Sequence, residues 1–490
     1  MKGDCILMEQ TDQNEIPKVP KRILTSLLAS VSAGVVPRAG APYLAIGRTD
    51  EIAALLSDLE TVNEGGGSMR FLIGRYGSGK SFLMQLIRGY ALERGFLTAD
   101  ADLSPERRLY GSGGSGVATY RELMKNLASK SSPDGGALPK ILARWITGLQ
   151  AAIVSDGVPA EGERFAAELN RRVLSALQEL EFLVGGFDFA HVVTAYYRAY
   201  TDGDDLRKSA CLRWLRGEFS TKTEARQELG FAVSVIIDDE NWYDFLKLWA
   251  AAARTMGYRG LVVFIDECVN LYKISHRVSR ENNYEKILAM FNDTLQGRAP
   301  GLALILGGTP QFLEDTRRGL FSYEALRSRL CDSRFALDGF KNLIGPVIRL
   351  RRLSDDELFA LITRVTRLYA QNYGSAPDLS PEQMAQFLQI CLSRAGADSM
   401  ITPREMLRDY MTVLNILMQN PDATFEQVVG SAVTLRPVED DEADHSRGEA
   451  HRGTAAAGEE GPSGRQSDPA SGGARENAGR RMYSPDEIDI

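Results

Sequence analysis

Histidine and cysteine are scarce in this sequence of 490 residues, and the scarcity narrows the chemistry open to it. Of the four histidines, His445 and His451 lie in a polar C-terminal segment, so a histidine-based metal site is not expected. The five cysteines form no Cys-x-x-Cys pair and have no histidine partner at metal-ligand spacing. We therefore expect ordinary reduced thiols. The cysteines are Cys5, Cys211, Cys268, Cys331 and Cys391.

Long hydrophobic runs are also missing. The longest apolar runs, such as 231–237 and 302–306, fall far short of the roughly 18 residues that cross a bilayer. Residues 1–17 contain acidic and polar side chains where a signal peptide would have an apolar core of about 7–15 residues. The sequence therefore predicts a cytoplasmic protein with no membrane segment.

An excess of positive charge is absent as well. The net charge is −8, but segment 437–490 alone holds thirteen Asp or Glu and six Arg, which leaves the rest of the chain close to neutral. A neutral body gives no global argument for nucleic-acid binding. With 44% apolar and 25% charged residues, the composition is that of a globular protein long enough for two or three domains.

A complete phosphate-binding loop is present at 74–81, where the sequence matches the GxxxxGK[ST] pattern. A short apolar run at 69–73 precedes it and helical periodicity at 82–92 follows it, so strand, loop and helix come in the order that phosphate binding requires. Lys80 would meet the β- and γ-phosphates, and Ser81 would ligate Mg²⁺. The alternative is a glycine-rich turn that precedes Lys-Ser by chance. The predicted nucleotide-binding residues here are Gly74, Arg75, Tyr76, Gly77, Ser78, Gly79, Lys80 and Ser81.

A second motif ends an apolar strand with two carboxylates. Residues 261–265 are apolar, and Asp266 and Glu267 follow directly. In a parallel sheet these acids would lie at the carboxyl edge, where ligands collect. Asp266 would hold the magnesium shell, and Glu267 would orient or deprotonate the attacking water. The alternative is that both acids only cap the start of a helix.

The fold class predicted from this pattern is α/β, with a P-loop NTPase (AAA+-like) parallel sheet, a large helical insertion, a C-terminal helical lid and a disordered tail. Strands are expected near 69–73, 96–101, 261–265 and 302–306. The predicted domains are an N-terminal helical segment (1–42), the first part of the ATPase domain (43–118), the helical insertion (119–230), the second part of the ATPase domain (231–350), the lid (351–436) and the acidic tail (437–490).

Further residues are weaker candidates. Thr309 ends the strand near 302–308 and could hydrogen-bond the γ-phosphate or the water, although a Thr-Pro pair is also a common helix start. Arg327 and Arg329 could reach the nucleotide of a neighbouring subunit, but helices often carry surface arginines. Arg404 opens a helix of the predicted lid and could close onto the nucleotide.

Taken together, these motifs resemble the AAA+ class of P-loop ATPases. In that resemblance Gly47 and Arg48 are similar to the segment that touches adenine, Thr309 to the first sensor and Arg404 to the second. More closely, the chain resembles the P-loop ATPase family encoded in BREX phage-defence islands, particularly its smaller members. The segments that carry the closer resemblance are 36–40, 71–81, 101–107, 214–218, 238–243, 291–297 and 307–329.

The resemblance implies an ATPase that uses ATP and Mg²⁺ and works with other phage-defence proteins such as a helicase. Direct DNA contact and oligomer formation stay open, because the insertion is long and no extra DNA-binding domain follows the lid. Three functions fit: a motor or remodelling ATPase, a slow nucleotide-gated assembly switch, and a loader of DNA-processing machinery. The tail could be a docking peptide or only a solubilising segment.

Overall fold

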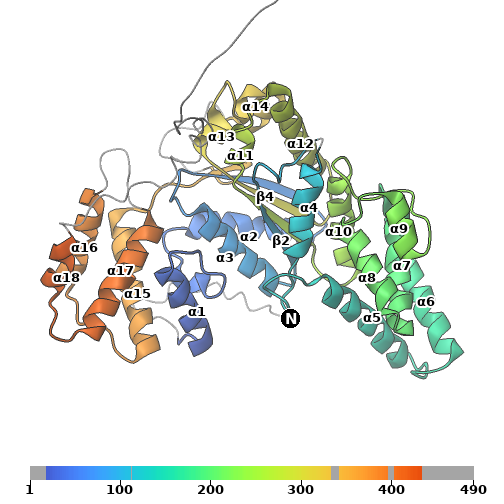
Figure 1. Ribbon diagram of the computed structural model, residues 1–490, viewed down its shortest axis with the longest axis horizontal. Coiled ribbons are helices and arrows are strands. Elements are labelled where there is room, and N and C mark those ends of the chain that lie inside the picture. Colours follow the sequence, from blue (N-terminus) through green and yellow to red (C-terminus); the bar gives the residue numbers. More distant parts are fainter. Residues whose placement is uncertain (1–17, 112, 333–341, 395–401, 433–490) are drawn as a thin grey trace, which may run out of the picture. The chain divides into compact units, whose positions relative to one another are not determined.

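The computed structural model of the protein describes residues 18–111, 113–332, 342–394 and 402–432. It contains a five-stranded β-sheet in which every pairing is parallel (Figure 1). The strand order is β2-β3-β4-β1-β5. All five carboxyl ends therefore meet at one edge of the sheet. The strands are β1 (Ser68–Ile73), β2 (Leu97–Asp102), β3 (Leu261–Asp266), β4 (Leu302–Gly308) and β5 (Val347–Arg349).

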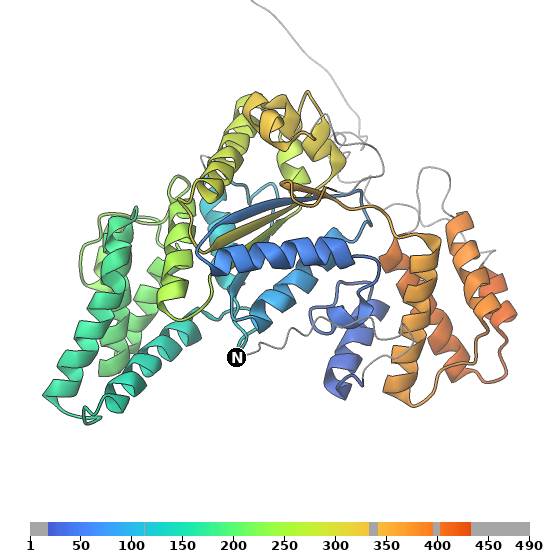
Figure 2. The same cartoon turned by 180° about the vertical axis from the view of Figure 1, so that it is seen from behind.

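The sheet has apolar side chains on both faces, because successive residues of a strand point to opposite sides. In β3, Val262 and Phe264 join one core and Val263 joins the other. Helices cover both faces, as the predicted α/β class requires, and the architecture is compatible with a P-loop NTPase. One face packs on α2 (Thr49–Asn63) and α3 (Lys80–Glu93), which are drawn in shades of blue in Figure 2. The other face packs on α4 (Ser115–Lys125), α10 (Trp242–Thr255) and α12 (Arg277–Leu295).

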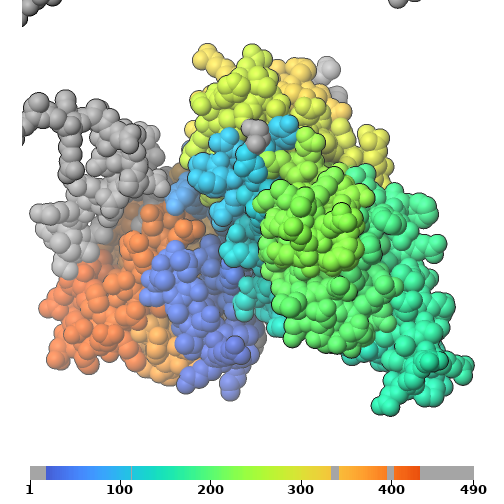
Figure 3. Space-filling model, turned by 45° about the vertical axis from the view of Figure 1, so that its right-hand side comes forward, coloured from blue at the N-terminus to red at the C-terminus, as the bar shows by residue number. Residues whose placement is uncertain are grey.

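A block of helices lies between β2 and β3 in the chain. The space-filling view in Figure 3 shows its residues, in teal and green, closely packed. Gly162 has a positive φ directly before one of these helices, and a 3₁₀ helix follows the same helix. The elements between α4 and α10 are α5 (Leu138–Ser155), α6 (Glu163–Gln178), η2 (Glu179–Phe182), α7 (Gly186–Asp202), α8 (Asp205–Leu215) and α9 (Lys222–Leu229).

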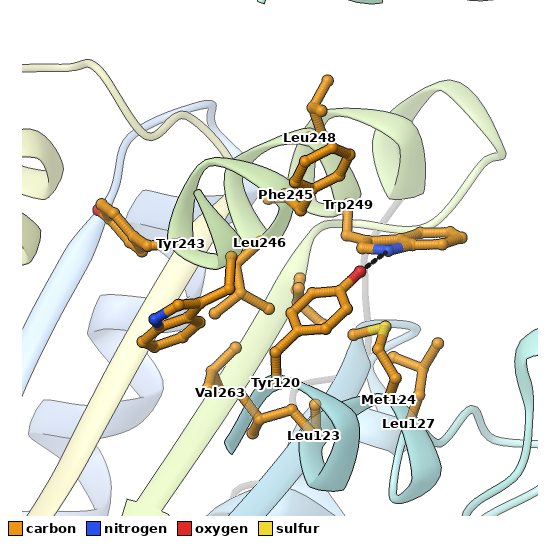
Figure 4. Close-up of a cluster of buried hydrophobic side chains, with 14 of the residues drawn as sticks. Tyr120, Leu123, Met124, Leu127, Tyr243, Phe245, Leu246, Leu248, Trp249 and Val263 are labelled. Atoms are coloured by element: carbon orange, nitrogen blue, oxygen red, sulfur yellow. Dashed lines mark hydrogen bonds between the residues drawn. The ribbon is translucent and has the colours of Figure 1, made fainter. Parts of the chain in front are cut away.

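A cluster of buried aromatic side chains packs this block of helices against the sheet (Figure 4). Tyr120 of α4 and Trp249 of α10 lie above Val263 of β3, and the Trp249 Nε1–H donates to the Tyr120 hydroxyl at 3.0 Å. That hydroxyl in turn donates to the carbonyl of Leu215 at the end of α8, at 2.8 Å. The buried Tyr120 hydroxyl thus accepts one hydrogen bond and donates another, and it links α4 to α8 and α10.

Two of the segments that carried the family resemblance have structural roles. The Asp239 carboxylate accepts hydrogen bonds from the N–H groups of Gly114, at 2.7 Å, and Val117, at 2.8 Å, and so caps the start of α4. The indole of Trp214 is buried and donates to the carbonyl of Val235 at 3.2 Å. Both segments therefore secure the helical block.

The N-terminal helix shares a core with the C-terminal helices. Leu27 and Leu28 of α1 belong to the same buried cluster as Val365 and Tyr410. Capping boxes begin α15 and α17, which explains why these helices start where they do. The helices of this group are α1 (Lys21–Ser32), α15 (Asp355–Tyr373), α16 (Pro381–Arg394), α17 (Pro403–Gln419) and α18 (Phe425–Ala432).

Short elements complete the described part of the chain. None of the helices in that part is long and apolar enough to span a membrane. The predicted disordered tail, 437–490, lies outside the described residues. The short elements are η1 (Ala41–Leu44), α11 (Val269–Tyr272), α13 (Pro310–Glu314), η3 (Leu320–Ser322) and α14 (Glu324–Leu330).

Candidate nucleotide-binding site

The glycine-rich loop joins β1 to α3, as the sequence predicts. Gly77 and Gly79 have φ values of 74° and 86°, a backbone region that residues with a Cβ rarely adopt. Gly79 is also the N-cap of α3, and no atom lies within 4 Å of where its Cβ would be. The loop therefore presents open backbone and a helix N-terminus together, the arrangement that binds phosphate.

Lys80, the first residue of α3, folds back over the loop. Its ammonium donates to the carbonyls of Gly74, at 2.9 Å, and Arg75, at 3.2 Å. Burial lowers the pKa of Lys80, and the charges of Asp266 and Glu267 oppose that shift. The two acids are thus close enough for their charges to act on the loop lysine.

The acidic strand meets the loop through Ser81. The Ser81 hydroxyl donates to Asp266 Oδ2 at 2.6 Å, and Asp266 Oδ1 accepts from the Glu267 N–H at 2.8 Å. Gly307, on the neighbouring strand β4, leaves room for this carboxylate, because a Cβ there would overlap Asp266 Oδ1. The two predicted metal-ligating side chains therefore lie in direct contact.

Glu267 is held in an unusual conformation. Its φ is 57°, the only positive φ at a non-glycine position in the described residues. Its side chain reaches solvent, but surrounding protein atoms withdraw part of its hydration, which raises the pKa of Glu267. The charges of Asp266 and Asp102 raise the pKa further, whereas Lys80 opposes them. The N-cap of α11 is Cys268, so the acids do not serve as its cap.

Asp102 is a site residue that the sequence reasoning missed. It ends β2 directly opposite Asp266 in the parallel register. Partial loss of hydration raises the pKa of Asp102, and the charges of Asp266 and Asp100 raise it further. Its position in the sequence could have indicated this role, because Asp102 ends β2, and β2 is the neighbour of the strand that ends with the acidic pair.

A cavity of about 240 Å³ opens beside the loop. Gly77, Ser78, Gly79, Lys80 and Ser81 line it together with Glu267. Apolar side chains from α1, the segment that follows it through η1, α3 and the C-terminal region also line it, and this group is called the apolar compartment. They are Val31, Val35, Val36, Pro37, Leu44, Ile46, Phe82, Leu353, Leu361 and Leu407. The lining of the cavity therefore combines apolar side chains with residues of the phosphate loop.

The predicted adenine segment adjoins this cavity in part. Arg48 lines it and Gly47 does not. The Arg48 guanidinium donates to protein oxygens, including the carbonyl of Ser78 at 2.9 Å. Of the remaining loop residues, Tyr76 lines the cavity with 75% of its surface exposed, whereas Arg75 is exposed and lies outside the lining.

Thr309 follows β4, which lies between the loop strand β1 and the acidic strand β3. Its hydroxyl accepts from the Phe312 N–H at 3.3 Å and caps α13, as in the helix-start alternative. Thr309 does not line the cavity, but its strand ends between the two motifs.

Of the three arginines predicted to reach a nucleotide, one lines the cavity and two do not. Arg404, the second residue of α17, is exposed and lines the cavity. Thr402, just before it, is 9% exposed, and a Cβ on Gly77 would lie 2.6 Å from its Cγ2. Arg327 and Arg329 are exposed on α14 and do not line the cavity. The structure thus brings Arg404 to the site and leaves the other two facing solvent.

The donor set fits a magnesium nucleotide. In the described part of the chain, no cluster of three or more His, Cys, Asp or Glu could hold a metal by itself. Mg²⁺ commonly takes one or two protein oxygens and completes its shell with phosphates and water. Ser81 and Asp266 supply such a pair beside a loop that is open toward phosphate.

The comparisons with known proteins agree with this geometry. Residues 19–433 match the sequence model of a family described as BREX system ATP-binding protein BrxC/D. No curated protein matches the chain. The family match spans the loop, the acidic strand and the C-terminal helices, so the chain belongs to the BrxC/D family of BREX system ATP-binding proteins.

Proposed function

We propose that this protein binds ATP with Mg²⁺ in the cavity and hydrolyses it as an AAA+-like ATPase of a bacterial phage-defence complex. The supporting observation is the 2.6 Å contact between Ser81 and Asp266. It brings the end of β3 to the phosphate loop, whose residues line one cavity together with apolar side chains. A nucleotide combines a flat, weakly polar base with a charged triphosphate, so such a lining suits it.

In this proposal the base enters among the side chains of the apolar compartment, beside Arg48, which Gly47 directly precedes in the chain. The loop amides and the start of α3 face the phosphates. Lys80 exchanges the carbonyls of Gly74 and Arg75 for β- and γ-phosphate oxygens. The lysine gains a charged partner in place of neutral ones, which favours binding.

Ser81 and Asp266 hold Mg²⁺, which when bound neutralises charge on the phosphate oxygens. Glu267 orients the attacking water and accepts its proton. Its strained backbone and raised pKa support that role, because both features cluster at catalytic positions. Thr309, at the end of the intervening strand, contacts the γ-phosphate or the water.

Arg404 closes onto the phosphates from the start of α17, which makes the C-terminal helices a lid over the nucleotide. Arg327 or Arg329 reaches the site of a second copy of the chain, since both are exposed and remote from the cavity of their own chain. ATP turnover would then be coupled, in the cytoplasm, to remodelling of a partner such as a helicase, or of DNA.

A second candidate function is a slow nucleotide-gated assembly switch. The cationic residues that line the cavity are Arg48, Lys80 and Arg404, and the Arg48 guanidinium is already bonded to protein oxygens. A single chain with so few free cations would stabilise transferring phosphate poorly. Turnover measured with and without DNA separates the two, because a switch shows little stimulation. A loader would show salt-dependent DNA binding.

The proposed function is tested by Glu267→Gln, which keeps the shape of the side chain and removes its basicity. We expect the Kd for ATP to change little and turnover to fall roughly 10²–10⁴-fold, the usual contribution of a general base. Glu64→Gln, an exposed glutamate next to the end of α2, is the matched control. Unchanged turnover in Glu267→Gln would remove Glu267 from this role, and failure of the unaltered chain to bind ATP would overturn the function itself.

A further inference from the structure

Arg48 is among the few buried charged residues in the described part of the chain, with 4% of its surface exposed. It immediately precedes α2, and its Nη1 contacts Glu51 Oε1 at 3.4 Å. Glu51 is itself 5% exposed. A buried charge is retained only where it is paired and hydrogen-bonded, so this position is built around the guanidinium.

The remaining donors of Arg48 connect two separate parts of the site. Nη2 donates to the carbonyl of Ser78, inside the phosphate loop, at 2.9 Å. The same nitrogen donates to the carbonyl of Arg351, in the segment that leads from β5 into α15. One side chain therefore bonds the nucleotide-binding loop to the connection of the C-terminal helices.

The residues next to these bonds are tightly packed. A Cβ on Gly47 would overlap Glu357 Oε1 of α15. That carboxylate accepts from both terminal nitrogens of the Arg351 side chain, at 2.6 Å and 2.5 Å, which lowers the pKa of Glu357 to about 2. Arg48 therefore bonds the loop carbonyl to a segment that is itself bonded to α15.

We propose that Arg48 is a positioning residue that couples the conformation of the phosphate loop to the position of α15 and α17 over the cavity. The proposal rests on the proposed function, since ATP is the ligand that moves the loop. Arginine suits this role because its planar fork donates in several fixed directions, whereas lysine donates from one point.

The test uses Arg48→Lys in the full chain, with Arg22→Lys, an exposed arginine of α1, as the control. ATP affinity is measured with a fluorescent, non-hydrolysable ATP analogue. Hydrogen exchange is followed in peptides spanning 351–361 and 403–410, with and without saturating analogue. We expect Arg48→Lys to bind the analogue up to about tenfold more weakly than the unaltered chain, because a residue that couples two parts of the site also contributes that coupling to affinity. We also expect it to lose the analogue-induced protection of both peptides, which the control keeps.

Other results overturn the inference in distinguishable ways. A loss of affinity of about thirtyfold or more, with full protection at saturation, would make Arg48 a nucleotide contact instead. Protection retained at unchanged affinity, or absent from the unaltered chain although the analogue binds, would show that no coupling passes through Arg48. Failure of the unaltered chain to bind the analogue would count against the proposed function.

If Arg48→Lys does not fold, Glu51→Gln provides the second variant. It leaves the guanidinium in place and removes the carboxylate that fixes its orientation. We expect the same loss of analogue-induced protection in peptides 351–361 and 403–410, with folding monitored by circular dichroism. Full protection in a folded Glu51→Gln chain would overturn the inference.

Discussion

At the scale of single residues, the carboxyl edge of the sheet concentrates negative charge where no cation neutralises it fully. Asp102 and Asp266 end two adjacent strands, and Glu267 follows Asp266. Partial loss of hydration raises the pKa of both Asp102 and Glu267, and the charge of Asp266 raises both further. The φ of 57° at Glu267 adds backbone strain, which costs on the order of 1–3 kcal/mol. A bound divalent cation would relieve this repulsion.

This repulsion predicts a pH effect. Glu267 acts as a base only when ionised, and its pKa is raised, so kcat/KM should fall on acidification at a higher pH than for an ordinary glutamate. Asp102→Asn removes one like charge and lowers the pKa of Glu267, so the acidic limb should move to lower pH. The measurement is the pH profile of kcat/KM, with Glu106→Gln, an exposed glutamate in the segment after β2, as control. An acidic limb that stays in place would disprove the influence of Asp102.

At the scale of elements, the phosphate loop lies against the start of α17, and residues of both line the cavity. Gly77 has a positive φ and lies against Thr402, whose hydroxyl accepts from the Glu405 N–H at 3.2 Å to cap α17. Loop and helix start therefore fit each other only because the loop residue has no side chain. Neither could move without changing the other.

Gly77→Ala should accordingly weaken ATP binding, by at least about tenfold, because the new Cβ both strains the loop and meets Thr402. Gly89→Ala is the matched control: Gly89 lies within α3 with open space at its Cβ position, so alanine should stabilise the helix by roughly 1 kcal/mol. Titration with labelled ATP and thermal melts measure both effects. Equal ATP affinities for the two variants would contradict the expected contact.

Local motifs of the site could be predicted from the sequence, whereas contacts between distant segments could not. The loop and the acidic strand follow from local patterns, and the structure brings Lys80, Ser81 and Asp266 together. Strand β5 was not predicted, because three residues carry no periodicity. The apolar face of α1 was readable, but its partners were not, since periodicity identifies a buried face and not what buries it. The hydrogen bond from the buried Arg48 side chain to the carbonyl of Arg351 was likewise not predictable, because the two residues are 303 positions apart in the sequence.

At the scale of the whole molecule, the proposed role of Arg327 and Arg329 of α14 predicts that ATP turnover requires two chains in contact. If Arg327 or Arg329 completes the site of a neighbour, turnover per chain should rise with protein concentration. Arg327→Ala chains keep their own loop, and Glu267→Gln chains keep their arginines. Mixing the two should therefore restore turnover that neither shows alone.

The control for this mixture is Arg317→Ala, an exposed arginine in the loop between α13 and η3. It should lose no turnover in isolation. The same mixing series is repeated with Arg329→Ala to identify which arginine acts. Turnover per chain that does not change with concentration, together with no recovery in either mixture, would favour the slow switch over the oligomeric motor.

The apolar compartment is assembled from opposite ends of the chain, since Val31 and Leu407 line the same cavity. A ribosome delivers the phosphate loop early and Leu407 more than three hundred residues later, and proteins begin to fold while they are being made. The nascent polypeptide therefore carries the phosphate loop before the C-terminal residues that line the same cavity exist. On the proposed function, tight nucleotide capture would await synthesis of the C-terminal helices.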